Sequence, residues 1–255
     1  MTSAARRALV ALALVVSMTP GAVAQQVAPR PLDRPLQVLL LADRSASMSA
    51  DYDQLNALRA RYPEIRSIAD LRMELPRSLS AGLRPDAAVQ FGSFGRIIQF
   101  SRVVAPDRPA LQAAMAETEQ DGGPSPIWDA MSRAAESLAA RDGDRVILLV
   151  TDGRASGNVL GFDDALKDAL SAGVRVYVFD MRSASDLSVE NRHTFNDPDG
   201  PNRDLRRIAV NTNGAYVAID RTIRLSLPRL VEQTVRELSA PRRSAAAPAP
   251  PARRF

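Results

Sequence analysis

Short apolar segments alternate along the chain with longer segments whose apolar residues are spaced three and four apart. Compact runs of mostly apolar residues predict strands that are covered on both faces, because a strand with one wet face would alternate with polar residues. The predicted strands are residues 37–41, 87–91, 97–100, 145–150, 174–179 and 215–219.

The longer segments are Ala-rich or amphipathic and predict helices between these strands. They are residues 68–83, 108–119, 127–140, 162–172, 202–211 and 227–238. Pro76 predicts a kink or a restart in the first of them, because proline removes a helical hydrogen bond. Residues 49–65 fit no element and are interpreted as an insertion after the first strand.

Strands that alternate with helices predict an α/β fold with a mainly parallel sheet and helices on both of its faces. The strands at 87–91 and 97–100 are separated by a short segment that contains Gly92 and Gly95. Such a turn predicts a hairpin, and therefore one antiparallel strand at the edge of the sheet.

The two ends of the chain differ from this body. Arg6 and Arg7 precede an apolar run at 8–18, and Ala22-Val23-Ala24 has the small-x-small pattern of a signal-peptidase site. The run is shorter than the roughly 20 residues of a membrane-spanning helix. We expect a signal peptide at 1–24 and a linker at 25–34, and hence an exported protein, periplasmic or extracellular, without a transmembrane span once the leader is removed.

Residues 239–255 are dominated by Pro, Ala and Arg, which predicts an extended, disordered tail. Leader and tail together hold six arginines, and without them the body has 27 basic against 29 acidic residues. The net charge of +4 therefore belongs to the ends of the chain, and we expect no nucleic-acid partner.

The composition also limits the chemistry. The absence of Cys excludes disulfides, thiolate metal sites and cysteine nucleophiles. The single histidine, His193, has no second His or Cys to join it and is interpreted as a surface residue. Residues 196–204 are acidic and turn-rich, but they lack the glycine and glutamate positions of an EF-hand and are interpreted as a surface loop.

Three loops that follow strands or begin helices offer one consistent chemistry. They provide two carboxylates and three hydroxyls, from Asp43, Ser45, Ser47, Ser125 and Asp152. Such hard oxygen ligands suit Mg²⁺, Mn²⁺ or Ca²⁺. Asp and Ser at these places also serve as helix caps and turn residues. The occurrence of all three loops together favours a metal site at the carboxyl ends of the strands.

The three loops resemble those of von Willebrand factor type A domains. Residues 41–48 are similar to the first metal loop of that family, 125–131 to the second and 149–153 to the third. The resemblance spans residues 35–238 and implies a doubly wound, six-stranded sheet with one antiparallel edge strand. It also implies a metal-ion-dependent adhesion site in which Mg²⁺ is held, directly or through water, by Asp43, Ser45, Ser47, Ser125 and Asp152.

This sequence departs from the family pattern at two positions. Ser125 stands where Thr is usual, and it keeps the hydroxyl without the methyl group that restricts the rotamer. Ala46 stands where Gly is common. Neither change removes a ligand.

We therefore expect an exported binding protein, not an enzyme, whose Mg²⁺ binds an acidic side chain of a protein partner. Arg44, Trp128 and Arg154 are candidates for the rim that contacts the partner, and the chain is expected to be a monomer or part of a larger assembly. One alternative is a structural module of an envelope assembly, with a vestigial or stabilising ion. A metal-dependent hydrolase is a second alternative, but no general base stands at a recognisable spacing.

Overall fold

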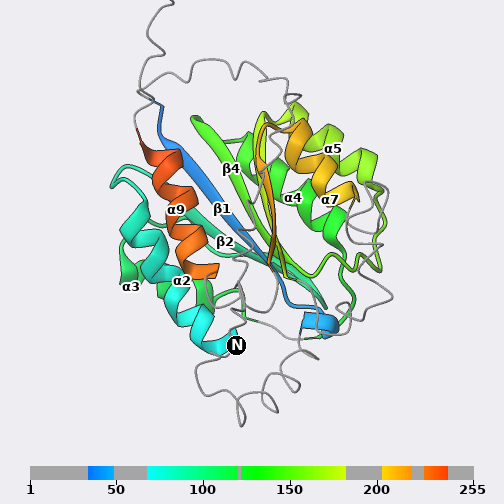
Figure 1. Cartoon of the computed structure of the whole chain (residues 1–255), viewed down its shortest axis with the longest axis horizontal. Coiled ribbons are helices and arrows are strands. Elements are labelled where there is room, and N and C mark those ends of the chain that lie inside the picture. Colours follow the sequence, from blue (N-terminus) through cyan, green and yellow to red (C-terminus); the bar gives the residue numbers. More distant parts are fainter. Residues whose placement is uncertain (1–33, 49–67, 120–121, 182–202, 220–226, 241–255) are drawn as a thin grey trace, which may run out of the picture.

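A six-stranded sheet forms the middle layer of the computed structural model, which describes residues 34–48, 68–119, 122–181, 203–219 and 227–240 (Figure 1). The strand order is β3-β2-β1-β4-β5-β6, and only β3 is antiparallel to its neighbour. The strands are β1 (Leu36–Asp43), β2 (Ala88–Phe94), β3 (Ile98–Phe100), β4 (Asp144–Thr151), β5 (Val174–Met181) and β6 (Ala215–Ile219). The predicted strands and the antiparallel edge are confirmed.

The central strand β1 shows why its sequence is a continuous apolar run. Val38 and Leu40 pack into the core on one face of the sheet, whereas Leu39 and Leu41 pack into the core on the other. All four side chains are buried. A strand that is covered on both faces needs apolar residues at every position, as parallel strands usually do.

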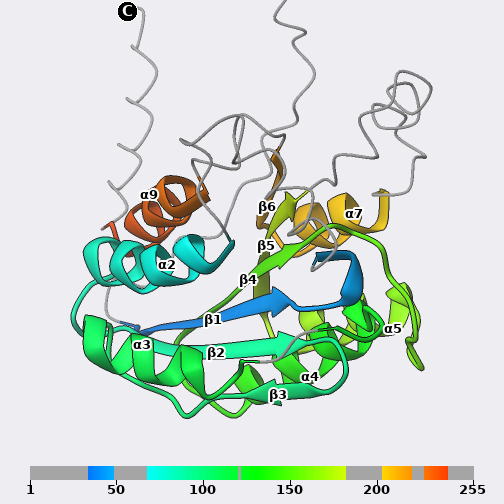
Figure 2. The ribbon, with the colours of Figure 1, turned by 90° about the horizontal axis from the view of Figure 1, so that it is seen from below.

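Helices cover both faces of this sheet (Figure 2). One face carries α2 (Ile68–Gly82), α3 (Arg108–Ala116) and α9 (Leu227–Ser239). The other carries α4 (Ile127–Ala139), α5 (Phe162–Ser171) and α7 (Arg203–Asn211). The prediction of a doubly wound α/β sheet is confirmed.

Helix α2 runs through Pro76 as one helix, so the predicted restart does not occur, and the alternative of a kink stays a prediction. Leu75 and Leu79, on either side of the proline, are buried in the same core as Val231 and Val235 of α9. Packing of this face against α9 offsets the hydrogen bond that the proline removes.

Several predictions fall outside the residues that the structure describes. They are the leader, most of the linker, the insertion at 49–65, His193, most of the loop at 196–204, and the tail beyond residue 240. Arg203 and Asp204, at the end of that loop, begin α7. Among the described helices, none is both long enough and apolar enough to cross a membrane.

The parallel strands end at a common carboxyl edge, where sites form in open α/β sheets. Ala42 of β1 is paired with Val150 of β4, which places Asp43 and Thr151 at the same level. Thr151 is in turn paired with Asp180 of β5. Three polar residues, each buried, therefore stand side by side where β1, β4 and β5 end.

Candidate metal centre

Asp43 lies at the centre of a hydrogen-bond network at the carboxyl edge. Its side chain is only 2% exposed. Its Oδ2 accepts hydrogen bonds from Ser125 Oγ (2.8 Å) and Thr151 Oγ1 (2.6 Å), and its Oδ1 accepts one from the backbone N–H of Ser45 (2.9 Å). One carboxylate thus gathers all three loops that the sequence singled out.

The surroundings of Asp43 oppose its negative charge. Burial raises the pKa of the Asp43 carboxyl, while hydrogen bonds from Ser45 and Thr151 lower it and the nearby charge of Asp152 raises it again. The net effect is a raised pKa, so the ionised form is costly here. A cation beside Asp43 would oppose both effects that raise the pKa.

Ser45 and Ser47 extend the network along the loop after β1. The side chain of Ser45 is buried and that of Ser47 is half-buried. Their Oγ atoms lie 3.1 Å apart, and the loop is closed by a hydrogen bond from the N–H of Met48 to the carbonyl of Ser45. The spacing of two residues therefore turns both hydroxyls toward the same place.

Asp152 has an oxygen atom that the protein leaves unsatisfied. Its side chain is 4% exposed, and its Oδ1 accepts a hydrogen bond from the backbone N–H of Arg154 (3.1 Å). Its Oδ2 is buried and has no hydrogen-bond partner among the described residues. A buried carboxylate oxygen without a partner is costly, and a cation is the ligand that would satisfy it.

The donor set fits a hard divalent cation. Two carboxylates and three hydroxyls are what Mg²⁺ accepts, and none of them is a nitrogen or sulfur ligand that would favour zinc. In the part of the chain that the structure describes, no cluster of three or more His, Cys, Asp or Glu could hold an ion. An ion at Asp43 and Asp152 would therefore depend on the serine hydroxyls and on water for the rest of its ligands.

The segment before Ser125 is fitted closely against the loop after β1. The N–H of Ala46 donates to the carbonyl of Gly123 (3.0 Å), and the N–H of Gly122 donates to that of Arg44 (2.8 Å). Gly123 has a φ of +93°, and a Cβ there would lie 2.6 Å from the backbone N of Arg96. Only glycine accepts both this conformation and this contact.

The loop after β4, residues 153–161, is bound to the start of α4. Ser125 and Ser156 bond each other twice, from Ser125 N to Ser156 Oγ (3.0 Å) and from Ser156 N to Ser125 O (2.8 Å). Asn158 Oδ1 accepts a hydrogen bond from the backbone N–H of Trp128 (2.7 Å). The start of α4 and the loop 153–161 are thus joined to each other.

Sequence reasoning missed several of these residues. Thr151 bonds Asp43 directly, and its place beside Asp152 at the end of an apolar strand was the available signal. Asp180 gave the same signal, since it follows the apolar run at residues 174–179. Its side chain is buried and accepts a hydrogen bond from the Tyr216 hydroxyl. Ser156 carried no local signal, because its partner is 31 residues away.

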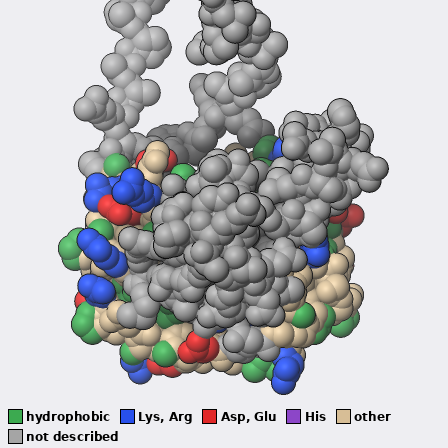
Figure 3. All heavy atoms as spheres, turned by 60° about the horizontal axis from the view of Figure 1, so that its bottom comes forward, with side chains coloured by type: hydrophobic (Ala, Val, Ile, Leu, Met, Phe, Trp, Pro, Cys, Tyr) green, Lys and Arg blue, Asp and Glu red, His purple; other side chains and the backbone are tan. Residues whose placement is uncertain are grey.

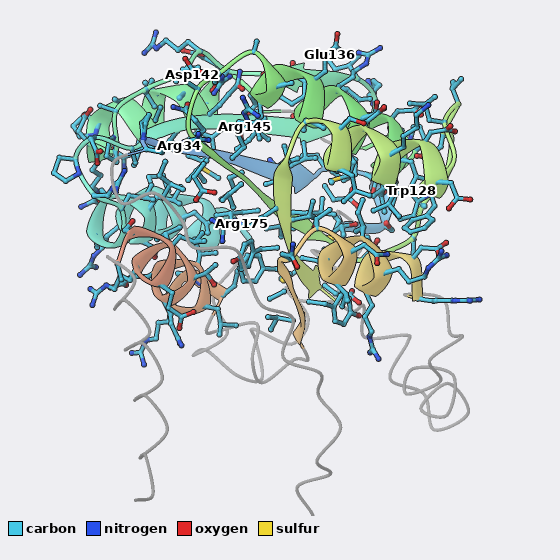
Figure 4. The ribbon with its side chains drawn as sticks, turned by 90° about the horizontal axis from the view of Figure 1, so that it is seen from above. Arg34, Trp128, Glu136, Asp142, Arg145 and Arg175 are labelled. Atoms are coloured by element: carbon cyan, nitrogen blue, oxygen red, sulfur yellow. The ribbon has the colours of Figure 1, made fainter. Side chains whose placement is uncertain are left out.

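The three rim candidates lie in different surroundings. Arg44 is half-buried and lines a cavity of about 480 Å³ with residues of β2 and α3, such as Phe91 and Met115. The ring of Trp128 packs edge-on against Phe162, with centroids 5.5 Å apart, at the end of the sheet away from Arg145 and Arg175 (Figure 4). Arg154 is exposed. Contact of these three with a partner stays a prediction.

The described surface mixes charges of both signs. In the view of Figure 3, basic side chains lie among acidic and apolar ones, and no continuous basic face is visible among the described residues.

Comparison with known proteins connects the fold to a family. The family model of the von Willebrand factor type A domain matches residues 38–233. No curated protein matches the sequence.

Several solved structures share the fold. An aerotolerance-related membrane protein from Bacteroides fragilis is 20% identical, with a TM-score of 0.52, and the match covers 79% of this chain and 99% of that one. The conserved hypothetical protein BatB from Bacteroides thetaiotaomicron is 18% identical, with a TM-score of 0.52 and coverage of 80% and 98%. A von Willebrand factor type A protein from Catenulispora acidiphila is 15% identical, with a TM-score of 0.54 and coverage of 81% and 42%. At these identities the matches show a common fold.

Proposed function

The chain belongs to the von Willebrand factor type A domain family, and on that premise we propose that it is an exported protein that binds a protein partner through a Mg²⁺-dependent adhesion site. Domains of this family mediate protein binding and often bind divalent cations. The observation that carries the proposal for this chain is Asp152 Oδ2, which is buried without a hydrogen-bond partner among the described residues, near a second buried carboxylate.

Five residues would hold the ion, directly or through water. Asp43 and Asp152 supply the charge, and Ser45, Ser47 and Ser125 supply neutral oxygens that already lie in one network with Asp43. Mg²⁺ in proteins is commonly held by one or two carboxylates and completes its octahedral coordination with water or a ligand from outside, so a carboxylate of the partner could replace such a water. A bound Mg²⁺ would supply a directed bond to a carboxylate of the partner, and the surrounding loops would supply the specificity.

The proposed role is binding without catalysis. Ser125 donates its hydroxyl hydrogen to Asp43, and Thr151 donates to the same oxygen, so these groups are engaged in holding the edge of the sheet together. A place in a bacterial envelope is part of the proposal, and one protein that shares the fold is named a membrane protein. There the chain would act as a monomer or as part of a larger assembly.

The test is capture of the partner from envelope extract on the immobilised full chain, with Mg²⁺ or with chelator. We expect capture by the wild type in Mg²⁺ only, and no capture by Asp152→Asn in either condition. Asp163→Asn makes the same chemical change at an exposed position of α5 and should behave as the wild type. Capture that is equal in Mg²⁺ and chelator for all three proteins would defeat the proposal.

A further inference from the structure

Helix α4 begins without a cap from its own N-terminal residue. Its N-cap position is Pro126, which makes no side-chain hydrogen bond to the first turn. The first N–H groups of a helix have no partner within the helix and are usually satisfied by a Ser, Thr, Asp or Asn at that position. Here the partner comes from the loop 153–161, where Asn158 Oδ1 accepts the hydrogen bond of Trp128 N–H at 2.7 Å.

The same loop holds Ser125 by its backbone. Ser156 Oγ accepts the N–H of Ser125, and Ser156 N–H donates to the carbonyl of Ser125, so one residue binds both polar groups of the Ser125 backbone. These two hydrogen bonds hold the backbone of Ser125 in place without a metal ion.

Asp129, in the first turn of α4, anchors the loop from the opposite direction. Its carboxylate accepts hydrogen bonds from the backbone N–H groups of Val159 (3.0 Å) and Leu160 (2.7 Å). Hydrogen bonds thus run both ways between α4 and the loop, and they fix the loop as well as the helix start. A charged acceptor makes such bonds stronger than those between neutral groups.

We propose that Ser156 and Asn158, anchored by Asp129, form a clamp that positions the Ser125 hydroxyl for the metal ion. Serine lacks the methyl group that restricts the rotamer of threonine, so its hydroxyl is directed by the hydrogen bond to Asp43, which it can make only while its backbone stays in place. The clamp supplies that constraint, and the hydroxyl points at Asp43 Oδ2, 2.8 Å away. The clamp rests on the proposed metal site, and its members are positioning residues.

The clamp connects the ion to the outer surface of the loop. Arg154 and Gly157 are exposed on it, and Val159 is 91% exposed. A partner that contacts these residues would stabilise the arrangement that holds Ser125. By thermodynamic linkage, ion and partner would then each raise the affinity of the other.

The experiment uses the full chain with Mn²⁺ as the probe and measures the Mn²⁺ affinity from the EPR signal of the free ion. We expect Ser156→Ala to weaken Mn²⁺ binding about tenfold or more, as loss of a residue behind a ligand usually does. Ser156→Thr retains the hydroxyl and should restore the affinity. Ser137→Ala is the control, because Ser137 donates its hydrogen bond near the other end of α4, to Gln90.

A second readout needs no metal. In the metal-free wild type, the amide hydrogens of Ser125 and Trp128 should be protected from exchange in NMR spectra. Ser156→Ala should speed exchange at Ser125, and Asn158→Ala should speed it at Trp128, while circular dichroism reports whether each variant folds. If Ser156→Ala does not fold, Asn158→Ala carries both measurements.

The outcomes separate the clamp from the metal site. A wild type that binds no Mn²⁺ overturns the proposed function and the role of the clamp with it. A wild type that binds Mn²⁺, with an equally tight Ser156→Ala, overturns the clamp and leaves the metal site intact. Unprotected amides at Ser125 and Trp128 in the wild type would also overturn it.

Discussion

The two ends of the sheet both bury polar groups, but they treat charge differently. At the amino edge, where β4 and β5 begin, Arg175 donates to Asp144 (2.5 Å) and to the hydroxyl of Tyr177 (3.2 Å). On the opposite face of the sheet (Figure 4), Arg145 donates to the backbone carbonyls of Arg141 (2.7 Å) and Ala172 (2.8 Å). The charges of Arg175 and Arg145 are therefore met there by an opposite charge or by carbonyl oxygens.

At the carboxyl edge three buried carboxylates lie close to one another, those of Asp43, Asp152 and Asp180. Burial penalises charge at both edges, since it lowers the pKa of Arg175 and raises that of Asp43. Asp144 supplies the opposite charge for Arg175, whereas the neighbour of Asp43 is a second carboxylate, Asp152. The pair of Arg175 and Asp144 is balanced within the chain, whereas Asp152 Oδ2 has no hydrogen-bond partner among the described residues. In the proposed function, a cation from outside would balance the carboxylates of the carboxyl edge, and this difference would distinguish a stabilising cluster from a binding site.

The largest expected effect tests the amino edge. Arg175→Ala should lower the free energy of unfolding by about 3 kcal/mol, because it leaves Asp144 without its arginine in a pair whose side chains are only 15% and 17% exposed. Urea denaturation should give the same loss in Mg²⁺ and in chelator. Arg207→Ala removes an exposed pair with Asp204 and should cost below about 1 kcal/mol. A loss for Arg175→Ala that depends on Mg²⁺ would break the comparison.

The next effect tests the carboxyl edge. Mg²⁺ at a hundred times its dissociation constant should stabilise the wild type by about 2.7 kcal/mol. Asp152→Asn should abolish this increment, and without metal it should be at least as stable as the wild type, since it removes one of two like charges. Thermal unfolding with Mg²⁺ and with chelator measures both quantities. A variant that is strongly destabilised without metal would show that Asp152 is a structural residue.

A smaller effect separates the scaffold from the site. Trp128→Ala should lower the free energy of unfolding by about 1–2 kcal/mol, because it removes the edge-on contact with Phe162 and a half-buried ring. The increment from Mg²⁺ should stay as in the wild type. Chemical denaturation of both proteins, each with and without Mg²⁺, measures the free energy of unfolding and the increment from Mg²⁺. Loss of that increment would place Trp128 within the site.

The smallest effect concerns the loop surface. Val159→Ser should change the free energy of unfolding by less than about 0.5 kcal/mol, because the side chain is 91% exposed. Its Mn²⁺ affinity should also be unchanged, while capture of the partner from envelope extract should weaken. Wild-type capture by this variant would show that Val159 makes no contact with the partner.

The sequence predicted the sheet, and it singled out the three loops that meet at Asp43, because both signals are local. The apolar run of β1 ends at Asp43, and that of β4 ends at Thr151 and is followed by Asp152. The site residues are therefore adjacent in the sequence to the strands that position them. Of the kink or restart expected at Pro76, the restart does not occur, because packing against α9, far along the chain, keeps α2 in one piece. The hydrogen bond of Asn158 to Trp128 joins residues 30 apart, and no pattern in either segment indicates it.

The bonds of Asp43 to Ser125 and Thr151 join residues 82 and 108 positions apart in the chain. Contacts of such sequence separation form slowly, since long segments must close before they are made. The proposed metal site is therefore not yet formed in any partly folded chain in which β4 has not docked beside β1. An ion bound there would select the finished fold, and its release on unfolding would report directly when the central strands separate.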